Sequence, residues 1–190
     1  MQLAAIDAGL EPRSETEIHG IIGLGIPQAL AILYPDEPQP QLDILHERYS
    51  HHFMIKDQRP CELYPGVDEA LTELKSTGHH IAVATSKSRR GLARVLGNLG
   101  WEDHFHATRC ADETASKTDP LMLSEIIQEL DYEVEDAVMV GDTEFDLEMA
   151  SRLGMRRVGV SYGAHLPKHL GLHQPEVIID EIKDLLHIIK

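Results

Sequence analysis

The 190-residue sequence has little cysteine, few aromatic residues and few cations for its size. Its two cysteines, Cys61 and Cys110, lie far apart and in none of the spacings used by metal sites or redox motifs, so we expect buried or free thiols. Only 17 Lys and Arg stand against 32 Asp and Glu, a net charge of −15. Binding to nucleic acid or to an anionic membrane needs a positive surface, so neither is expected as a partner.

The sequence also lacks a long hydrophobic run. The longest uncharged, apolar-looking stretch, residues 20–33, contains Pro27 and is too short to span a bilayer. Residues 1–7 lack the basic flank and the apolar segment of a signal peptide. Because a hydrophobic content of 42% still suffices for a core, we expect a folded cytoplasmic protein, either one domain or one domain with a small insertion.

The pattern of the chain changes near residue 60. Residues 1 to about 58 show only helical patterns, with a capping box at Ser14 and Glu17. After Leu63, short apolar runs typical of buried strands alternate with helical patterns that end at glycines. The predicted strands cover residues 80–85, 105–109, 137–140, 158–160 and 177–179, and the predicted helices 67–77, 89–99, 119–130, a segment ending at Gly154, and 181–189. Such alternation predicts an α/β fold with a doubly wound parallel sheet.

Three loops that follow predicted strands carry polar residues suited to phosphate chemistry. Thr85 and Ser86 precede a helix whose N-terminus could hold an anion. Lys117 stands at the start of another helix, where its cation could neutralise phosphate charge. Asp142 ends a strand and Asp146 lies in the next helical turn, and such carboxylates suit Mg²⁺. Taken singly, the three features could be a helix cap, a solvated lysine and a surface charge. The order of the three loops along the chain favours a functional site instead.

On these residues the chain resembles the haloacid dehalogenase-like (HAD) phosphatases, especially the phosphoglycolate-phosphatase-like hydrolases. The matching segments, in chain order, are 63–67, Thr85, Lys117, 141–146, 150–155 and 159–163. The resemblance implies an α/β HAD-like Rossmannoid core over residues 61–190 and a small all-helical cap over residues 1–60.

The resemblance also implies roles for the site residues. Thr85 and Ser86 would bind the substrate phosphate, Lys117 would bridge phosphate and nucleophile, and Asp142 would ligate Mg²⁺. Asp146 would bind Mg²⁺ through water or orient Lys117. The implied function is Mg²⁺-dependent hydrolysis of a small phosphorylated metabolite, such as phosphoglycolate, through an aspartyl-phosphate.

The chain departs from the family at the first motif, Asp-x-Asp-Gly-Thr, which supplies the nucleophile. No such run occurs, and the nearest substitute, Asp7, has Gly9 two positions on in place of the second aspartate and fits the end of a helix better. We therefore expect the first central strand to be missing, so that two strand edges are exposed or pair directly, Mg²⁺ binds weakly, and the chain as given is inactive. Exposed edges also favour a homodimer. The alternative is a non-catalytic HAD-like binding or interaction protein.

Overall fold

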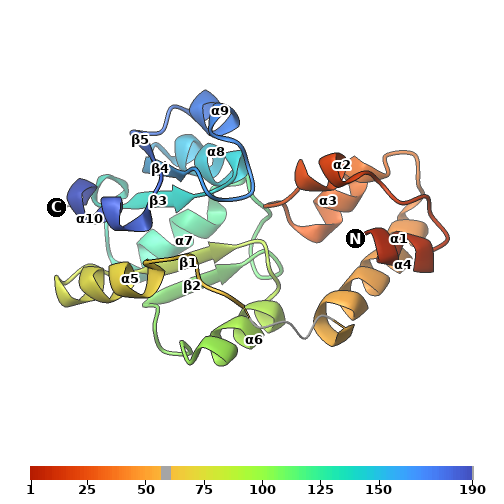
Figure 1. Cartoon of the computed structure of the whole chain (residues 1–190), viewed down its shortest axis with the longest axis horizontal. Helices are drawn as coiled ribbons and strands as arrows, with labels where there is room; N and C mark the ends of the chain where they lie inside the picture. Colours follow the sequence, from red (N-terminus) through yellow and green to blue (C-terminus); the bar gives the residue numbers. More distant parts are fainter. Residues whose placement is uncertain (57–60, 190) are drawn as a thin grey trace. The chain divides into compact units, whose positions relative to one another are not determined.

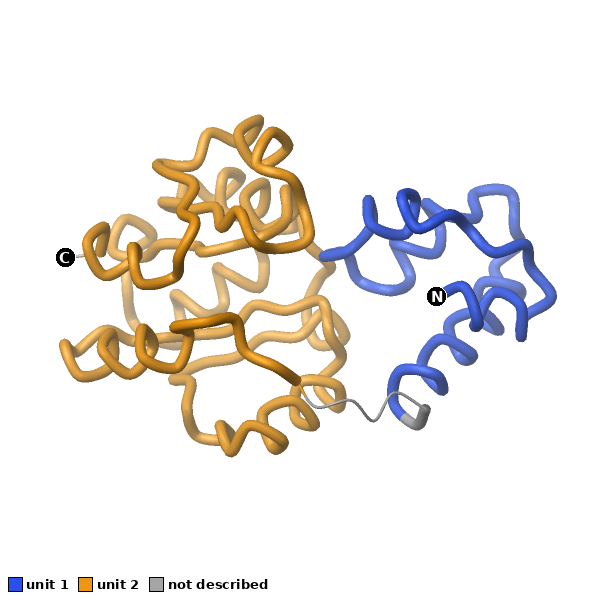
Figure 2. The backbone as a smooth tube through the Cα atoms, in the orientation of Figure 1, with its two compact units in different colours: residues 1–60 blue, residues 61–190 orange. Residues whose placement is uncertain are grey.

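The computed structural model describes residues 1–56 and 61–189. The chain divides into two compact units, Met1–Pro60 and Cys61–Lys190 (Figure 2). In the described part, no helix combines the length and the apolar character that a membrane span requires.

The first unit is built from helices (Figure 1). They are α1 (Gln2–Asp7), α2 (Glu15–His19), α3 (Ile26–Leu33) and α4 (Gln39–His51), followed by a π-helical segment, His52–Lys56. The predicted capping box is present, because Ser14 and Glu17 exchange side-chain and backbone hydrogen bonds at the start of α2. α1 packs against α4, and Ala4 and Ala5 of α1 are fully buried.

Asp7 lies at the end of a helix, as the sequence predicts. It is the last residue of α1, and Gly9 follows with a φ of 74°, a conformation that glycine adopts without strain. The Asp7 carboxylate lies 2.8 Å from Nε2 of His52 in the same unit. It therefore serves in a helix–helix contact, and no strand precedes it.

The second unit is an α/β structure, as predicted. Its strands are β1 (Ala82–Thr85), β2 (Ala107–Cys110), β3 (Val138–Gly141), β4 (Arg156–Val160) and β5 (Val177–Ile179). Its α-helices are α5 (Val67–Ser76), α6 (Arg89–Leu99), α7 (Leu121–Leu130), α8 (Glu144–Leu153), α9 (Pro167–Leu170) and α10 (Leu185–Ile188). All strand pairs are parallel, with Thr85 beside Cys110 and Gly141 beside Gly159 in register.

The parallel strands form two separate groups. β1 pairs with β2, and β3, β4 and β5 pair in that order, so the described strands β1 and β3 each keep one unpaired edge. Ala84 of β1 and Met139 of β3 nevertheless pack against one apolar cluster, which contains Met122 of α7. Val140 of β3 is only half-buried, whereas Val158 of β4 is fully buried. For a missing central strand, the sequence predicts either two exposed strand edges or direct pairing of the two flanking strands. The structure shows the exposed edges, because β1 and β3 do not pair with each other.

Two helices differ from their predicted bounds. The helix expected from residue 119 begins at Leu121, because Pro120 is its N-cap and Asp119 accepts a hydrogen bond from the Leu121 N–H (2.9 Å). The helix expected over residues 181–189 is a 3₁₀ turn, Ile182–Asp184, followed by α10. So short a segment is only marginally stable as a helix by itself, so its packing against α5 determines its form.

The two thiols differ in exposure, which predicts different reactivity. Cys110 is fully buried, and burial raises its pKa to about 11, whereas Cys61 is exposed. Since the thiolate is the nucleophile, we expect one thiol to react quickly with an aromatic disulfide reagent in native protein and two after denaturation. Cys61→Ser should remove the native signal. Fast reaction of Cys110 in the folded chain would contradict this prediction.

Candidate active site

The segment between β3 and α8 carries the two predicted carboxylates. Thr143 is the N-cap of α8, and its hydroxyl accepts a hydrogen bond from the Asp146 N–H (3.3 Å). In return, Oδ2 of Asp146 accepts hydrogen bonds from the N–H and hydroxyl of Thr143 (3.1 and 2.7 Å). This reciprocal cap fixes Asp146 in the first turn of α8, while Asp142 lies directly after β3.

Asp146 forms a buried ion pair with Lys117. Nζ of Lys117 lies 2.5 Å from Oδ1 of Asp146, and the two side chains are 9% and 5% exposed. Because Oδ2 is bonded to Thr143, both carboxylate oxygens are engaged. Of the two roles implied for Asp146, the ion pair fits the one in which Asp146 orients Lys117.

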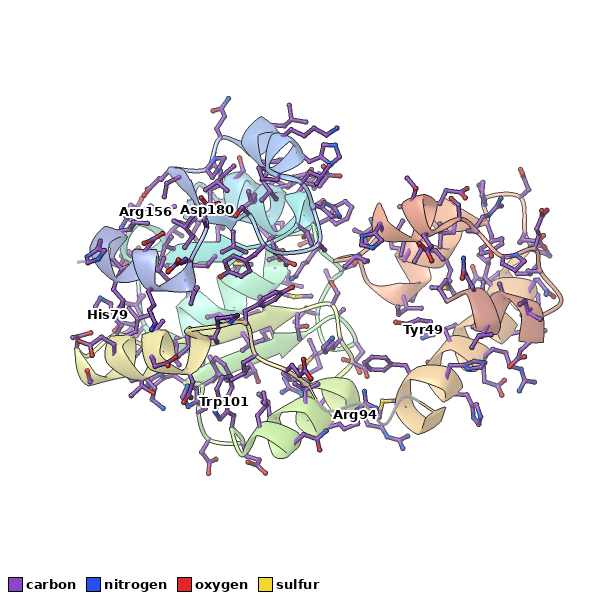
Figure 3. The ribbon with its side chains drawn as sticks, viewed as in Figure 1. Tyr49, His79, Arg94, Trp101, Arg156 and Asp180 are labelled. Carbon is purple, nitrogen blue, oxygen red and sulfur yellow. The ribbon has the colours of Figure 1, made fainter. Side chains whose placement is uncertain are left out.

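Asp142 is held by the loop that follows β4. Its Oδ2 accepts a hydrogen bond from the Ala164 N–H (2.9 Å), and its carbonyl oxygen accepts one from the His165 N–H (3.0 Å). Gly163 packs so closely that an added Cβ would lie 2.5 Å from Oδ2 of Asp142. Among the described residues, Oδ1 has no hydrogen-bond partner, so this oxygen can accept a ligand. The loop is anchored further by Asp180 (labelled in Figure 3). Its carboxylate accepts a hydrogen bond from the Ser161 hydroxyl (2.5 Å).

Thr85 and Ser86 lie at the carboxyl end of β1, on the other side of the interruption in the sheet from Asp142. Oγ1 of Thr85 accepts a hydrogen bond from the Lys87 N–H (3.2 Å), which holds the turn after the strand. The arrows in Figure 1 show that β1 and β3 end on the same side of the second unit. The residues predicted from three separate loops thus come to one side of the α/β unit.

The N-terminus of α6 differs from the sequence-based expectation. Ser88 accepts a hydrogen bond from the Gly91 N–H (3.2 Å), and the carboxylate of Asp112, after β2, accepts one from the Arg89 N–H (2.9 Å). A carboxylate therefore takes the position where the sequence predicts an anionic ligand. The side chains of the preceding turn, rather than the amides at the start of α6, are therefore the candidates for phosphate binding.

A buried histidine, His165, also lies in this region, and it is not among the residues that the sequence analysis singles out. His165 is 6% exposed, and its Nδ1 accepts a hydrogen bond from the Glu144 N–H at the start of α8 (3.2 Å). It lies two residues beyond the segment 159–163 that matches the family, and no sequence periodicity distinguishes it from the exposed His169.

The described residues do not form a complete Mg²⁺ site. Among them, no group of three His, Cys, Asp or Glu side chains is arranged to hold a metal ion. Asp142 offers one free carboxylate oxygen and Asp146 offers none, whereas Mg²⁺ requires octahedral coordination by oxygen. A metal held here needs further ligands.

The fold and the site geometry define an α/β protein with a cation–carboxylate pair at the carboxyl ends of parallel strands. Residues 1–160 match the family model described as haloacid dehalogenase-like hydrolase. The chain belongs to this family, as the sequence predicts, and it groups with the family's phosphoric monoester hydrolases.

Two relatives, each matched over most of its own length, support this assignment. A phosphoglycolate phosphatase of Cereibacter sphaeroides is 32% identical over 190 residues, with 96% of this chain and 86% of the relative covered. A phosphoglycolate phosphatase of Agrobacterium fabrum is 29% identical over 183 residues, with 94% and 78% covered.

Solved structures agree on the fold. A hydrolase from Pseudomonas syringae has a TM-score of 0.85 at 21% identity, with 98% of this chain and 87% of that chain covered. A β-phosphoglucomutase from Clostridium difficile has a TM-score of 0.80 at 16% identity, with 97% and 82% covered.

Proposed function

We propose that this chain carries the phosphate-binding and metal-binding parts of a Mg²⁺-dependent phosphatase that acts on a small phosphorylated metabolite. The observation that carries the proposal is the buried ion pair between Lys117 and Asp146, together with the position of Asp142 in the turn just before α8. Phosphoglycolate is the first substrate to test, because several similar relatives are phosphoglycolate phosphatases.

Each side chain has a distinct task in this proposal. The hydroxyls of Thr85 and Ser86 donate hydrogen bonds to phosphate oxygens. The ammonium of Lys117, held in place by Asp146, neutralises the charge that develops on the phosphoryl group. The free oxygen of Asp142 is one metal ligand, and Mg²⁺ would neutralise phosphate charge when bound.

The nucleophile of an aspartyl-phosphate mechanism must come from outside the described site. The 190 residues contain no Asp-x-Asp run. We infer that a strand carrying this motif would pair between β1 and β3, since each has an unpaired edge there. Its carboxyl end would then deliver an aspartate between Thr85 and Asp142.

The test compares the 190-residue chain with a version extended at its N-terminus by a strand, a turn and a helix carrying Asp-x-Asp-Gly-Thr. With p-nitrophenyl phosphate or phosphoglycolate and Mg²⁺, we expect background turnover from the chain as given. The extended chain should be faster by on the order of 10³-fold or more. Replacing the first aspartate of the added motif by asparagine is the matched control and should return turnover to background.

Either half of the result can refute the proposal. Turnover by the 190-residue chain, abolished by Lys117→Met, would show that the nucleophile is already present. A folded extended chain without turnover of either substrate would exclude the phosphatase assignment.

The unpaired edges of β1 and β3 favour a second candidate, a non-catalytic protein that binds an extended segment of a partner or of a second copy. This candidate predicts a homodimer or a stable complex without turnover. Sedimentation of the chain over a range of concentrations tests it, because self-pairing gives a mass that doubles as concentration rises. A monomer at all concentrations would exclude the homodimer.

A further inference from the structure

His165 connects the two segments that hold Asp142. It directly follows Ala164, whose N–H binds the Asp142 carboxylate. The N–H of His165 donates to the carbonyl oxygen of Asp142 (3.0 Å), and Nδ1 of its ring accepts from the N–H of Glu144 (3.2 Å). His165 is therefore hydrogen-bonded both to Asp142 and to Glu144, two positions later in the chain.

The hydrogen bonds of the ring determine its chemical form. Nδ1 accepts a hydrogen bond and so carries no hydrogen, which leaves Nε2 as the ring nitrogen that carries one. Nε2 is buried and has no hydrogen-bond partner among the described residues. The ring packs edge-on against Phe145, with centroids 5.4 Å apart.

This arrangement is not what apolar packing alone would favour. A buried N–H without an acceptor is unfavourable, and an apolar side chain would fill the same space without it. The start of α8 is also capped by its own residues, Thr143 and Asp146. What the imidazole adds is the acceptor at Nδ1, which ties the first amide of α8 to the loop after β4.

We propose that His165 is a positioning residue for Asp142. By fixing Glu144 and residues 161–165 against each other, it keeps Oδ2 of Asp142 on the Ala164 N–H and leaves Oδ1 for a ligand. The inference rests on the proposed function, in which Asp142 is a metal ligand, but the geometry that it predicts can be measured without turnover.

The experiment uses two variants of matched size, His165→Asn and His165→Leu. Asparagine places a carbonyl oxygen close to the position of Nδ1, whereas leucine has the same shape and no acceptor. In the 190-residue chain, hydrogen exchange of the Ala164 amide is followed by NMR, together with the thermal midpoint. We expect exchange at Ala164 to be faster by about tenfold or more in His165→Leu and to stay within about threefold of the parent in His165→Asn.

The ring itself gives a second readout. Its nitrogen NMR signals should show a hydrogen on Nε2 and none on Nδ1, and a hydrogen on Nδ1 would overturn the proposal. Unchanged exchange in a folded His165→Leu, or equal losses in both variants, would also overturn it. If neither variant folds, His165 belongs to the folding core and the proposal is wrong. A catalytic failure of the extended chain would refute the phosphatase assignment and leave the exchange result standing.

Discussion

Replacing Lys117 by methionine lowers the free energy of unfolding by about 3–5 kcal/mol, because it leaves the Asp146 carboxylate buried without its cation. The pair is less than one-tenth exposed on both sides, so water cannot replace the lost ammonium. For a chain of this length, the thermal midpoint should fall by on the order of 10 °C. Thermal and urea unfolding, followed by circular dichroism, measure both quantities.

Two further variants test this explanation. Lys168→Met removes an exposed lysine in α9 and should change the stability by less than about 0.5 kcal/mol. The double variant Lys117→Met, Asp146→Asn removes both charges, and it should be more stable than Lys117→Met alone. If Lys117→Met were as mild as Lys168→Met, the ion pair would not contribute as the geometry indicates.

Replacing Gly163 by alanine should destabilise the chain by about 1–3 kcal/mol and displace Asp142. The new methyl group would overlap the Asp142 side chain, 2.5 Å from Oδ2, so either the loop or the carboxylate must move. The hydrogen bond from the Ala164 N–H to that carboxylate would be lost with it. Unfolding gives the energetic effect, and the NMR signal of the Ala164 amide gives the local one.

Gly171→Ala is the matched control for this substitution. An added Cβ at Gly171 meets nothing within 4 Å, so this change should stay within about 0.5 kcal/mol of the parent. Equal stability of the two variants would mean that Asp142 and its loop rearrange freely. The close packing around the carboxylate would then not hold it in place.

Local sequence signals predicted much of the fold. The glycines at positions 9, 100 and 154 end helices in the structure with positive φ values, because the left-handed conformation is disfavoured for residues with a Cβ. The helix expected over residues 89–99 has those bounds, and the five expected strands are all present. Such features depend on a few neighbouring residues, so an amino-acid pattern is enough to predict them.

The features that the sequence did not predict depend on contacts between residues far apart in the chain. Asp112 caps α6 from 23 residues away in the chain, and His165 accepts from Glu144 across 21 residues. No local sequence pattern identifies the hydrogen-bond partner of either residue. The resemblance to relatives implied the roles of Lys117 and Asp146, but not that both oxygens of Asp146 would be engaged within the protein.

The order of helices and strands, the family of the chain and the absence of an Asp-x-Asp run could be read from the amino-acid sequence, because they depend on local composition and spacing. The folded chain was needed to show that β1 and β3 do not pair with each other, that Lys117 and Asp146 form a buried ion pair, and that the loop after β4 holds Asp142. Strand pairing, burial and hydrogen bonding join residues far apart in the chain, so their geometry is fixed only by folding.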